Sequence, residues 1–85
     1  MPHTVYILKC NDDSLYVGCT NNLEKRLEEH NTSKRGAHYT KLRRPAALVY
    51  AESYSRLKKA RSREAEIKSW PRGKKLELIL RIQTI

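Results

Sequence analysis

Long apolar runs, targeting signals and cysteine motifs are all missing from this sequence of 85 residues. No stretch of 18 or more apolar residues occurs, which excludes a membrane-spanning helix. The first residues lack the basic and then apolar pattern of a signal peptide, and the two cysteines, Cys10 and Cys19, do not have a metal-ligand spacing such as C-x-x-C. Repeats, linkers and low-complexity tracts are absent as well. We therefore expect a single domain, residues 1–85, of a soluble cytoplasmic protein.

Several catalytic signatures are also absent. The chain has no G-x-S-x-G, no P-loop, no dinucleotide fingerprint and no H-E-x-x-H. Its three histidines are too scattered to indicate a zinc site. A two-metal nuclease would need clustered carboxylates, but Glu64 and Glu66 point roughly 200° apart on a helix. Few of the common catalytic arrangements therefore remain.

Positive charge is what the sequence has in excess. Eighteen Lys and Arg residues against nine Asp and Glu give a net charge of +9 and a pI near 9.9. Such an excess favours a polyanionic partner. We expect nucleic acid rather than a membrane surface, because no segment combines a basic face with bulky membrane-inserting residues. Charge alone does not separate DNA from RNA, or a binding module from an enzyme.

Apolar periodicity predicts three strands and three helices. The expected elements, in chain order, are strands over 4–10 and 15–20, a helix within 20–31, a strand over 46–54, and helices over 55–70 and 71–82. Asn21 and Ser55 are the expected caps of the first two helices, and alternation places Leu48 and Tyr50 on one face of the third strand. This order predicts a compact α+β fold, with helices packed on a small and partly antiparallel sheet.

Three polar residues fall within the apolar faces of the helices. Glu64 lies in the middle of the apolar stripe of the second helix, where a carboxylate needs compensation for its desolvation. It can form a structural salt bridge to Arg61 or Arg63, or act as a metal ligand or general base at a cleft. Arg26 and His30 are four residues apart on one face of the first helix. They can be a snorkelling arginine with a half-buried histidine, or functional groups.

Together with the strand tyrosines Tyr6 and Tyr16, these three side chains would suffice for phosphodiester cleavage. An arginine can bind the phosphate in bidentate fashion. A carboxylate can hold a divalent cation that polarises the phosphate, and a phenol or imidazole can take a proton from the attacking water. The alternative is that both tyrosines are ordinary core aromatics.

Two strand triplets and three helix residues match the motifs of a known superfamily. The matching elements are Thr4-Val5-Tyr6 for a Gly-Ile-Tyr signature, Tyr16-Val17-Gly18 for Tyr-Ile-Gly, then Arg26, His30 and Glu64. In these motifs the sequence resembles the GIY-YIG nucleases, in particular their small stand-alone members, from about residue 4 to about residue 80. Thr4 replaces the first glycine, and Cys19 stands where some repair nucleases of the family carry a lysine.

The resemblance implies a three-stranded antiparallel sheet flanked by helices, and hydrolysis of DNA phosphodiester bonds with a single Mg²⁺ or Mn²⁺. Glu64 would be the metal ligand, and Arg26 would stabilise charge on the phosphate. Tyr6 and Tyr16 would activate or orient the water, with His30 assisting. Gly18 is the motif glycine, and the further candidates for the site are Cys19, His38 and Tyr39.

A basic loop between the first helix and the third strand is predicted to contact phosphates. The expected DNA-binding residues are Lys34, Arg35, Lys41, Arg43 and Arg44. We expect an endonuclease of DNA repair or recombination, located at the nucleoid when it is bound to DNA. It would prefer structured or single-stranded DNA or have little specificity, and be a monomer or weak dimer whose specificity a protein partner can supply. The alternative is a catalytically inactive nucleic-acid-binding module with the same basic surface.

The shared site places a condition on the hairpin. A four-residue turn that pairs residue 10 with 15 would send Tyr6 and Tyr16 to opposite faces. It would also hold Cys10 and Cys19 too far apart for a disulfide. For both tyrosines to reach one phosphate, the register must have the other parity, for example Tyr6 opposite Tyr16 across a five-residue loop, or a bulge must intervene.

Overall fold

The computed structural model describes residues 2–32 and 43–83, and within them it has three strands and three helices in the predicted order. The elements are β1 (His3–Lys9), β2 (Leu15–Thr20), α1 (Leu23–Thr32), β3 (Ala47–Tyr54), α3 (Leu57–Lys68) and α4 (Arg72–Gln83). Both strand pairs are antiparallel and the order across the sheet is β2-β1-β3, so β1 lies in the centre. The predicted α+β fold with a three-stranded antiparallel sheet is therefore confirmed.

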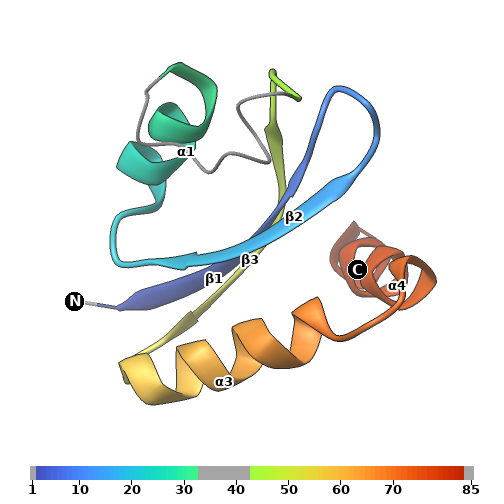
Figure 1. Cartoon of the computed structure of the whole chain (residues 1–85). Helices are drawn as coiled ribbons and strands as arrows, with labels where there is room; N and C mark the ends of the chain where they lie inside the picture. Colours follow the sequence, from blue (N-terminus) through green and yellow to red (C-terminus); the bar gives the residue numbers. More distant parts are fainter. Residues whose placement is uncertain (1, 33–42, 84–85) are drawn as a thin grey trace.

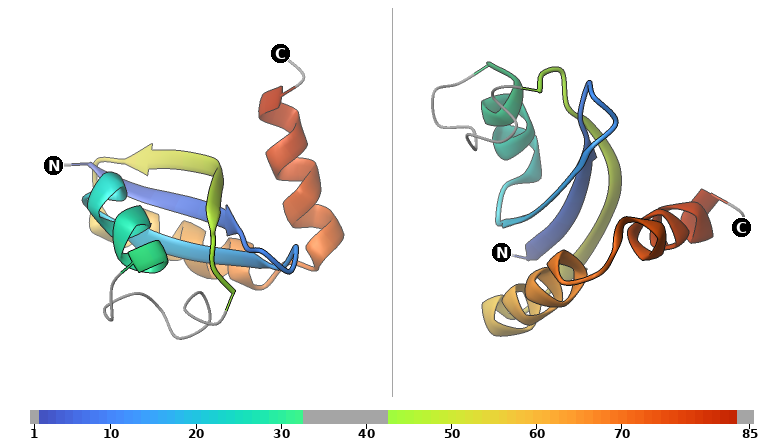
Figure 2. Two further views of the ribbon diagram at one scale, coloured as in Figure 1. Left: turned by 90° about the horizontal axis from the view of Figure 1, so that it is seen from above. Right: turned by 45° about the vertical axis from the view of Figure 1, so that its right-hand side comes forward.

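Helices cover both faces of the sheet. Figure 1 shows α1 on one face and α3 on the other, and Figure 2 shows α4 extending from the end of α3 beside the sheet. Ala60 and Ile67 of α3 belong to one core cluster, together with Val5 and Ile7 of β1. The other cluster, on the α1 side, contains Tyr6 and Leu8 of β1, with Leu23 and Leu27 of α1 packed against it.

The central strand explains why its sequence reads as a continuous apolar run. Val5, Tyr6, Ile7 and Leu8 are at most 1% exposed, with alternate side chains in the two clusters. A strand that is covered on both faces has no solvent side for polar residues. Because side chains alternate along the strand, Tyr6 points to the α1 face, whereas Val5 and Ile7 point to the α3 face.

The hairpin register meets the condition that the two tyrosines share a face. Lys9 pairs with Leu15, which leaves a five-residue loop, and Tyr6 pairs with Gly18 while Leu8 pairs with Tyr16. The register that pairs residue 10 with 15 is therefore wrong. Asp13 in the loop adopts φ 66°, a left-handed conformation that Asp tolerates better than most residues.

Local details differ from prediction in three places. The side chain that caps α1 belongs to Asn22, whose Oδ1 accepts from the Lys25 N–H at 3.1 Å, and not to Asn21. The N-cap of α3 is Arg56 rather than Ser55, and it makes no side-chain capping bond. Leu48 pairs with Leu8 and Tyr50 with Ile7, so a register shift in β3 puts these two residues on opposite faces.

The two cysteines are not bonded to each other. Cys10 and Cys19 are both free thiols, as expected. Among the described residues, no helix is long and apolar enough to cross a membrane.

Candidate active site

A buried pair of side chains, Tyr6 and His30, lies at the centre of the candidate site. Tyr6 reaches from β1 towards α1, and its Oη lies 2.8 Å from Nε2 of His30. His30 is fully buried and Tyr6 is 1% exposed. The hydrogen bond satisfies two polar groups that would otherwise be desolvated without compensation. The histidine that was expected to be half-buried is thus fully buried, and its hydrogen-bond partner is one of the candidate tyrosines.

Tyr16 completes an aromatic cluster with this pair. Its ring centroid lies 4.9 Å from that of His30 and 6.4 Å from that of Tyr6, with tilted or edge-on planes. Tyr16 is only partly buried, so it forms the solvent-facing side of the cluster. The hairpin register brings it there, because Tyr16 pairs with Leu8, the residue two positions after Tyr6.

Gly18 makes room for the phenol of Tyr6. A Cβ atom at this position would lie 2.4 Å from the Tyr6 Oη, 2.5 Å from its Cζ and 3.1 Å from Cε1 of Tyr16. Side chains never approach so closely. The second motif therefore needs glycine for close approach of the ring, although the backbone of Gly18 is ordinary.

Arg26 lies one turn before His30 on the same face of α1. Its Nη1 is 3.3 Å from Oε1 of Glu29, and its side chain is about a quarter exposed. A hydrogen bond and the charge of Arg26 both act to lower the pKa of Tyr6. The guanidinium of Arg26 therefore interacts electrostatically with Tyr6 and His30.

Both members of the buried pair are neutral near pH 7. Burial and the neighbouring Tyr16 raise the pKa of Tyr6 to about 12, against the effect of Arg26. Burial and the positive charges of Arg26 and Arg44 lower the pKa of His30 to about 4. A neutral imidazole beside a neutral phenol can accept a proton through it.

Glu64 lies on α3, which covers the opposite face of the sheet. It is 8% exposed, and its two carboxylate oxygens each lie 3.0 Å from a cation, Arg61 Nη1 and Lys68 Nζ. Of the two predicted salt-bridge partners, Arg61 is the one that pairs with it. Arg63 pairs instead with Glu52 and Glu66. The charge of Glu64 still raises the pKa of Tyr6, so its field extends to the aromatic cluster.

The carboxylate set near Glu64 is small. Within the described part of the chain, no three His, Cys, Asp or Glu residues are grouped as a metal cage. Mg²⁺ is commonly held by only one or two carboxylates, with waters and substrate phosphates as the other ligands. A single buried carboxylate such as Glu64 fits that manner of binding, provided that Arg61 and Lys68 release its oxygens.

Cys19 borders the α3 side of this region. It pairs with Val5 in the sheet and lines a cavity of about 320 Å³ together with His3, Leu57 and Arg61. Burial raises the pKa of the Cys19 thiol, and the charge of Glu64 raises it further, while Arg61 acts in the other direction. Cys19 is therefore a neutral neighbour of Glu64, not a preformed thiolate.

Arg43 and Arg44, two of the expected DNA-binding residues, make contacts within the protein. Arg44 Nε donates to the carbonyl of His30 at 2.6 Å, and Nη2 donates to that of Glu29 at 3.2 Å. Arg43 Nε donates to Asp12 Oδ2 at 2.9 Å. The remaining candidates of this segment, Lys34, Arg35, His38, Tyr39 and Lys41, lie outside the described residues.

Asn31 is a positioning residue that sequence reasoning missed, and Arg44, which was expected to contact DNA, has a similar position. Asn31 exchanges two hydrogen bonds with the backbone of Ala46, at 2.7 and 2.9 Å. With Arg44 on the last carbonyls of α1, these bonds fix the helix end that carries His30. An amide directly after the candidate histidine was the available signal.

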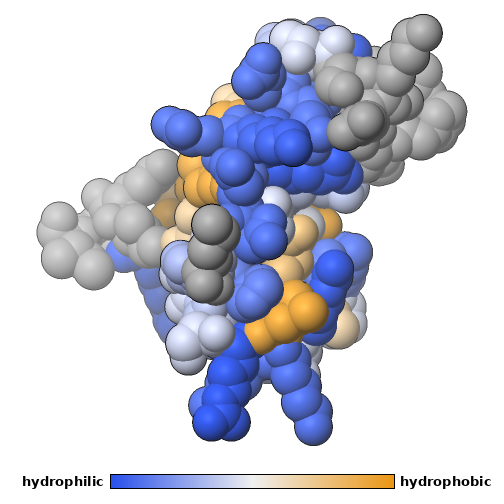
Figure 3. Space-filling model, turned by 90° about the vertical axis from the view of Figure 1, so that its left-hand side faces the viewer, coloured by the Kyte–Doolittle hydropathy of each residue, from blue (hydrophilic) through white to orange (hydrophobic). Residues whose placement is uncertain are grey.

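The surface at the end of the molecule that carries the N-terminus is mainly hydrophilic. Figure 3 views this end, where apolar side chains show only in small patches between charged and polar ones. Such a surface suits a polar, charged ligand better than a large apolar interface.

Comparisons with known proteins agree with the motif assignment. Residues 2–77 match the model of the GIY-YIG catalytic domain. A UPF0213 protein from Syntrophus aciditrophicus is 55% identical over 75 residues, which are 88% of this chain and 86% of that protein. A UPF0213 protein from Staphylococcus haemolyticus is 53% identical over 77 residues, 91% of this chain and 93% of its own.

Two solution NMR structures have a similar fold. A UPF0213 protein from Bacillus halodurans superposes with a TM-score of 0.61 at 39% identity, over 93% of this chain and 83% of that one. The protein EF2693 from E. faecalis gives a TM-score of 0.69 at 34% identity, over all of this chain and 90% of that one. These identities apply to nearly the whole chain.

Proposed function

The chain belongs to the GIY-YIG family, and we propose that it is a DNA endonuclease that hydrolyses phosphodiester bonds with one divalent cation, Mg²⁺ or Mn²⁺. The observation that supports this function best is the grouping of Tyr6, Tyr16, Arg26 and His30 on one face of the hairpin and α1. A core that needed only apolar volume would not need an arginine and a histidine there.

The residues of this group have different access to a substrate, and this suggests their roles. Tyr16 and Arg26 are partly exposed, whereas Tyr6 and His30 are buried. We assign Arg26 to the scissile phosphate, where a guanidinium can stabilise the charge of the transition state. Tyr16 would orient the attacking water from the solvent side.

The buried pair would receive the proton that the water loses. As the water oxygen bonds to phosphorus, the bond between phosphorus and the leaving oxygen breaks. The released proton moves to the Tyr6 oxygen while the Tyr6 proton moves to His30 Nε2 across their 2.8 Å hydrogen bond. This direction requires a neutral imidazole, and the low pKa of His30, about 4, provides one at pH 7.

Glu64 would hold the divalent cation. When bound, the ion would polarise the phosphate and stabilise the leaving oxyanion. Arg61 and Lys68 would have to leave the carboxylate oxygens for this to happen, and both side chains are more than half exposed, so they can swing into solvent. The phosphate itself is then an available partner for these two cations.

The same ion pairs favour a second candidate function. If Arg61 and Lys68 keep Glu64 occupied, the chain would be a catalytically inactive module that binds nucleic acid through its basic surface. The two functions differ in their response to metal, because phosphate binding by Lys and Arg needs no divalent cation.

A cleavage assay separates them. Purified protein is incubated with linear, single-stranded, branched and nicked DNA, in Mg²⁺, in Mn²⁺ and in EDTA. The endonuclease predicts products in the metal buffers alone, with the structured substrates preferred as in DNA repair or recombination. Binding that weakens steeply with salt, without products on any substrate, would establish the binding module instead.

A further inference from the structure

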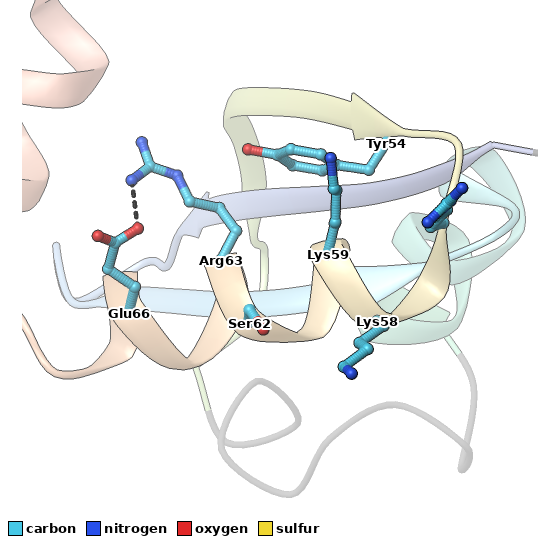
Figure 4. A pocket seen from close by; sticks show the side chains of 7 residues that line it. Tyr54, Lys58, Lys59, Ser62, Arg63 and Glu66 are labelled. Carbon is cyan, nitrogen blue, oxygen red and sulfur yellow. Dashed lines mark hydrogen bonds and ion pairs between the residues drawn. The ribbon is translucent and has the colours of Figure 1, made fainter.

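A groove of the described residues lies away from the candidate active site, between the end of β3 and the exposed side of α3. Its volume is about 670 Å³. Pockets for small ligands occupy about 300–1,000 Å³, so the groove has room for a nucleotide. Figure 4 shows the side chains that line it, which include Tyr54, Arg56, Lys58, Lys59, Arg63 and Glu66.

The lining is strongly basic. It contains four cations and one carboxylate, and that carboxylate, Glu66, is paired with Arg63 at 2.6 Å. Arg56, Lys58 and Lys59 are exposed, and none of them forms an ion pair with a residue that the structure describes. In Figure 4, Lys59 lies on the Tyr54 side of α3, whereas Lys58 points away. Lys59 is therefore better placed than Lys58 for an anion inside the groove, which Arg56 also lines.

An aromatic ring stands beside these cations in a fixed position. The Tyr54 hydroxyl donates to Glu52 Oε1 at 2.8 Å, and Arg63 Nε donates to the same oxygen at 2.7 Å. The ring is thus held at its far end while it lines the groove. Flat aromatic rings next to a positive groove are the means by which proteins bind unpaired bases.

The groove belongs to a different flank of α3 from the candidate catalytic glutamate. Lys59 is five residues before Glu64, which places it roughly 140° around the helix. Tyr54 ends β3, the edge strand opposite to β2, while Gly18 and Tyr16 belong to β2. A ligand in this groove would not occupy the Tyr6–His30 site.

We propose that this groove binds single-stranded nucleic acid, with one base stacked on Tyr54 and the adjacent phosphates on Arg56 and Lys59. A duplex keeps its bases stacked on each other, so it could use the cations but not the ring. An acidic peptide likewise would pair with the cations without needing an aromatic face. The inference takes from the proposed function only that the ligand is a nucleic acid, and does not require that the chain cleaves it.

The test measures binding of fluorescein-labelled oligothymidylate in EDTA by fluorescence anisotropy at several salt concentrations. Tyr54→Phe keeps the ring and Tyr54→Leu removes it, so their comparison isolates stacking from the hydroxyl bond to Glu52. Arg56→Gln with Lys59→Gln removes two groove charges. The matched control, Arg72→Gln with Lys75→Gln, removes two charges from the first turn of α4.

Tyr54→Leu should weaken binding by about 5- to 150-fold, as loss of one stacked base does, while Tyr54→Phe should bind as the wild type does. The double groove variant should weaken binding by about 10- to 60-fold at 50 mM salt and reduce the salt slope by about 1.4, that is 0.7 for each phosphate. The control variant should lose less affinity and less slope. A blunt duplex of equal length should be nearly insensitive to Tyr54→Leu.

Four results would overturn the inference. These are equal affinity of Tyr54→Leu and Tyr54→Phe, equal losses in the groove and control variants, equal losses for duplex and single strand, and displacement of the oligonucleotide by poly-glutamate at equal charge concentration. Because the assay contains no metal, these results would leave the cleavage proposal untouched. Absence of cleavage in the metal buffers would in turn leave the groove in place.

Discussion

The close packing of Tyr6 over Gly18 gives a prediction about stability that needs no substrate. In Gly18→Ala the new methyl group would lie 2.4 Å from the Tyr6 Oη and 2.5 Å from its Cζ. Tyr6 is 1% exposed and its hydroxyl bonds to His30, so the ring has little room to move. Overpacking of this kind costs about 1–3 kcal/mol. For a domain of this size, that loss lowers Tm by roughly 4–24 °C.

Gly73→Ala is the matched control. A Cβ atom at Gly73 meets no other atom within 4 Å, and the residue is exposed in the first turn of α4. Because alanine is the better helix former by about 1 kcal/mol, this variant should be as stable as the wild type or more stable. Urea unfolding followed by circular dichroism gives both free energies of unfolding.

A double-mutant cycle assigns the cost of Gly18→Ala to the ring. Tyr6→Leu is destabilising by itself, but it removes the atoms that the new methyl group would meet. The penalty of Gly18→Ala should therefore be smaller in the Tyr6→Leu background by about 1 kcal/mol or more. If Gly18→Ala is as stable as the wild type, or if its penalty is the same in both backgrounds, the phenol does not lie over Gly18.

Three further predictions concern the buried pair and Arg26. Tyr6→Phe should lower kcat by about 10²–10⁴-fold, because the proton path to His30 is lost; single-turnover cleavage measures this, and an unchanged rate would exclude the path. Folding lowers the pKa of His30 from 6.5 to about 4, so the unfolded chain binds more protons between these pH values. The stabilisation that this shift provides should be fully present above about pH 6.5, and the free energy of unfolding should fall by about 2–3 kcal/mol towards pH 4. An equal dependence of the unfolding free energy on pH in His30→Gln would refute the assignment. Arg26→Lys keeps the charge but loses the bidentate geometry, and should lower kcat by about 10²–10³-fold with little change in KM; a change in KM alone would make Arg26 a binding residue.

The element order was accessible from the sequence because each element has a clear apolar period. The apolar residues of 4–10 predicted a strand, but its burial on both faces and its place at the centre of the sheet were not predicted. The position of Arg26 and His30 on one helix face required only their spacing of four. Their meeting with Tyr6 required in addition that β1 and α1 pack together, which the motif resemblance supplied.

The strand register of the hairpin and the ion-pair partners of Glu64 could not be predicted from the sequence in the same way. The polar turn contains no Asn-Gly or Asp-Gly pair that would fix a two-residue hairpin, and Asp13 provides the left-handed residue instead. The sequence therefore did not decide whether Tyr6 and Tyr16 lie on the same face of the hairpin. Lys68 pairs with Glu64 from one turn further along α3, whereas the predicted partners were Arg61 and Arg63. The groove at Tyr54 depends on how α3 lies against β3, which no local pattern encodes.

The most direct test of the central claim compares Glu64→Gln with the wild type in cleavage and in binding. Glutamine keeps the shape and a hydrogen-bond acceptor for Arg61 and Lys68 but removes the charge that a divalent cation needs. The proposal predicts that the wild type cuts structured DNA in Mg²⁺, that Glu64→Gln and EDTA both abolish cutting, and that the variant folds and binds DNA in EDTA with wild-type affinity. Equal cutting by Glu64→Gln, or cutting by the wild type in EDTA, would contradict a metal-dependent nuclease in which Glu64 is the metal ligand.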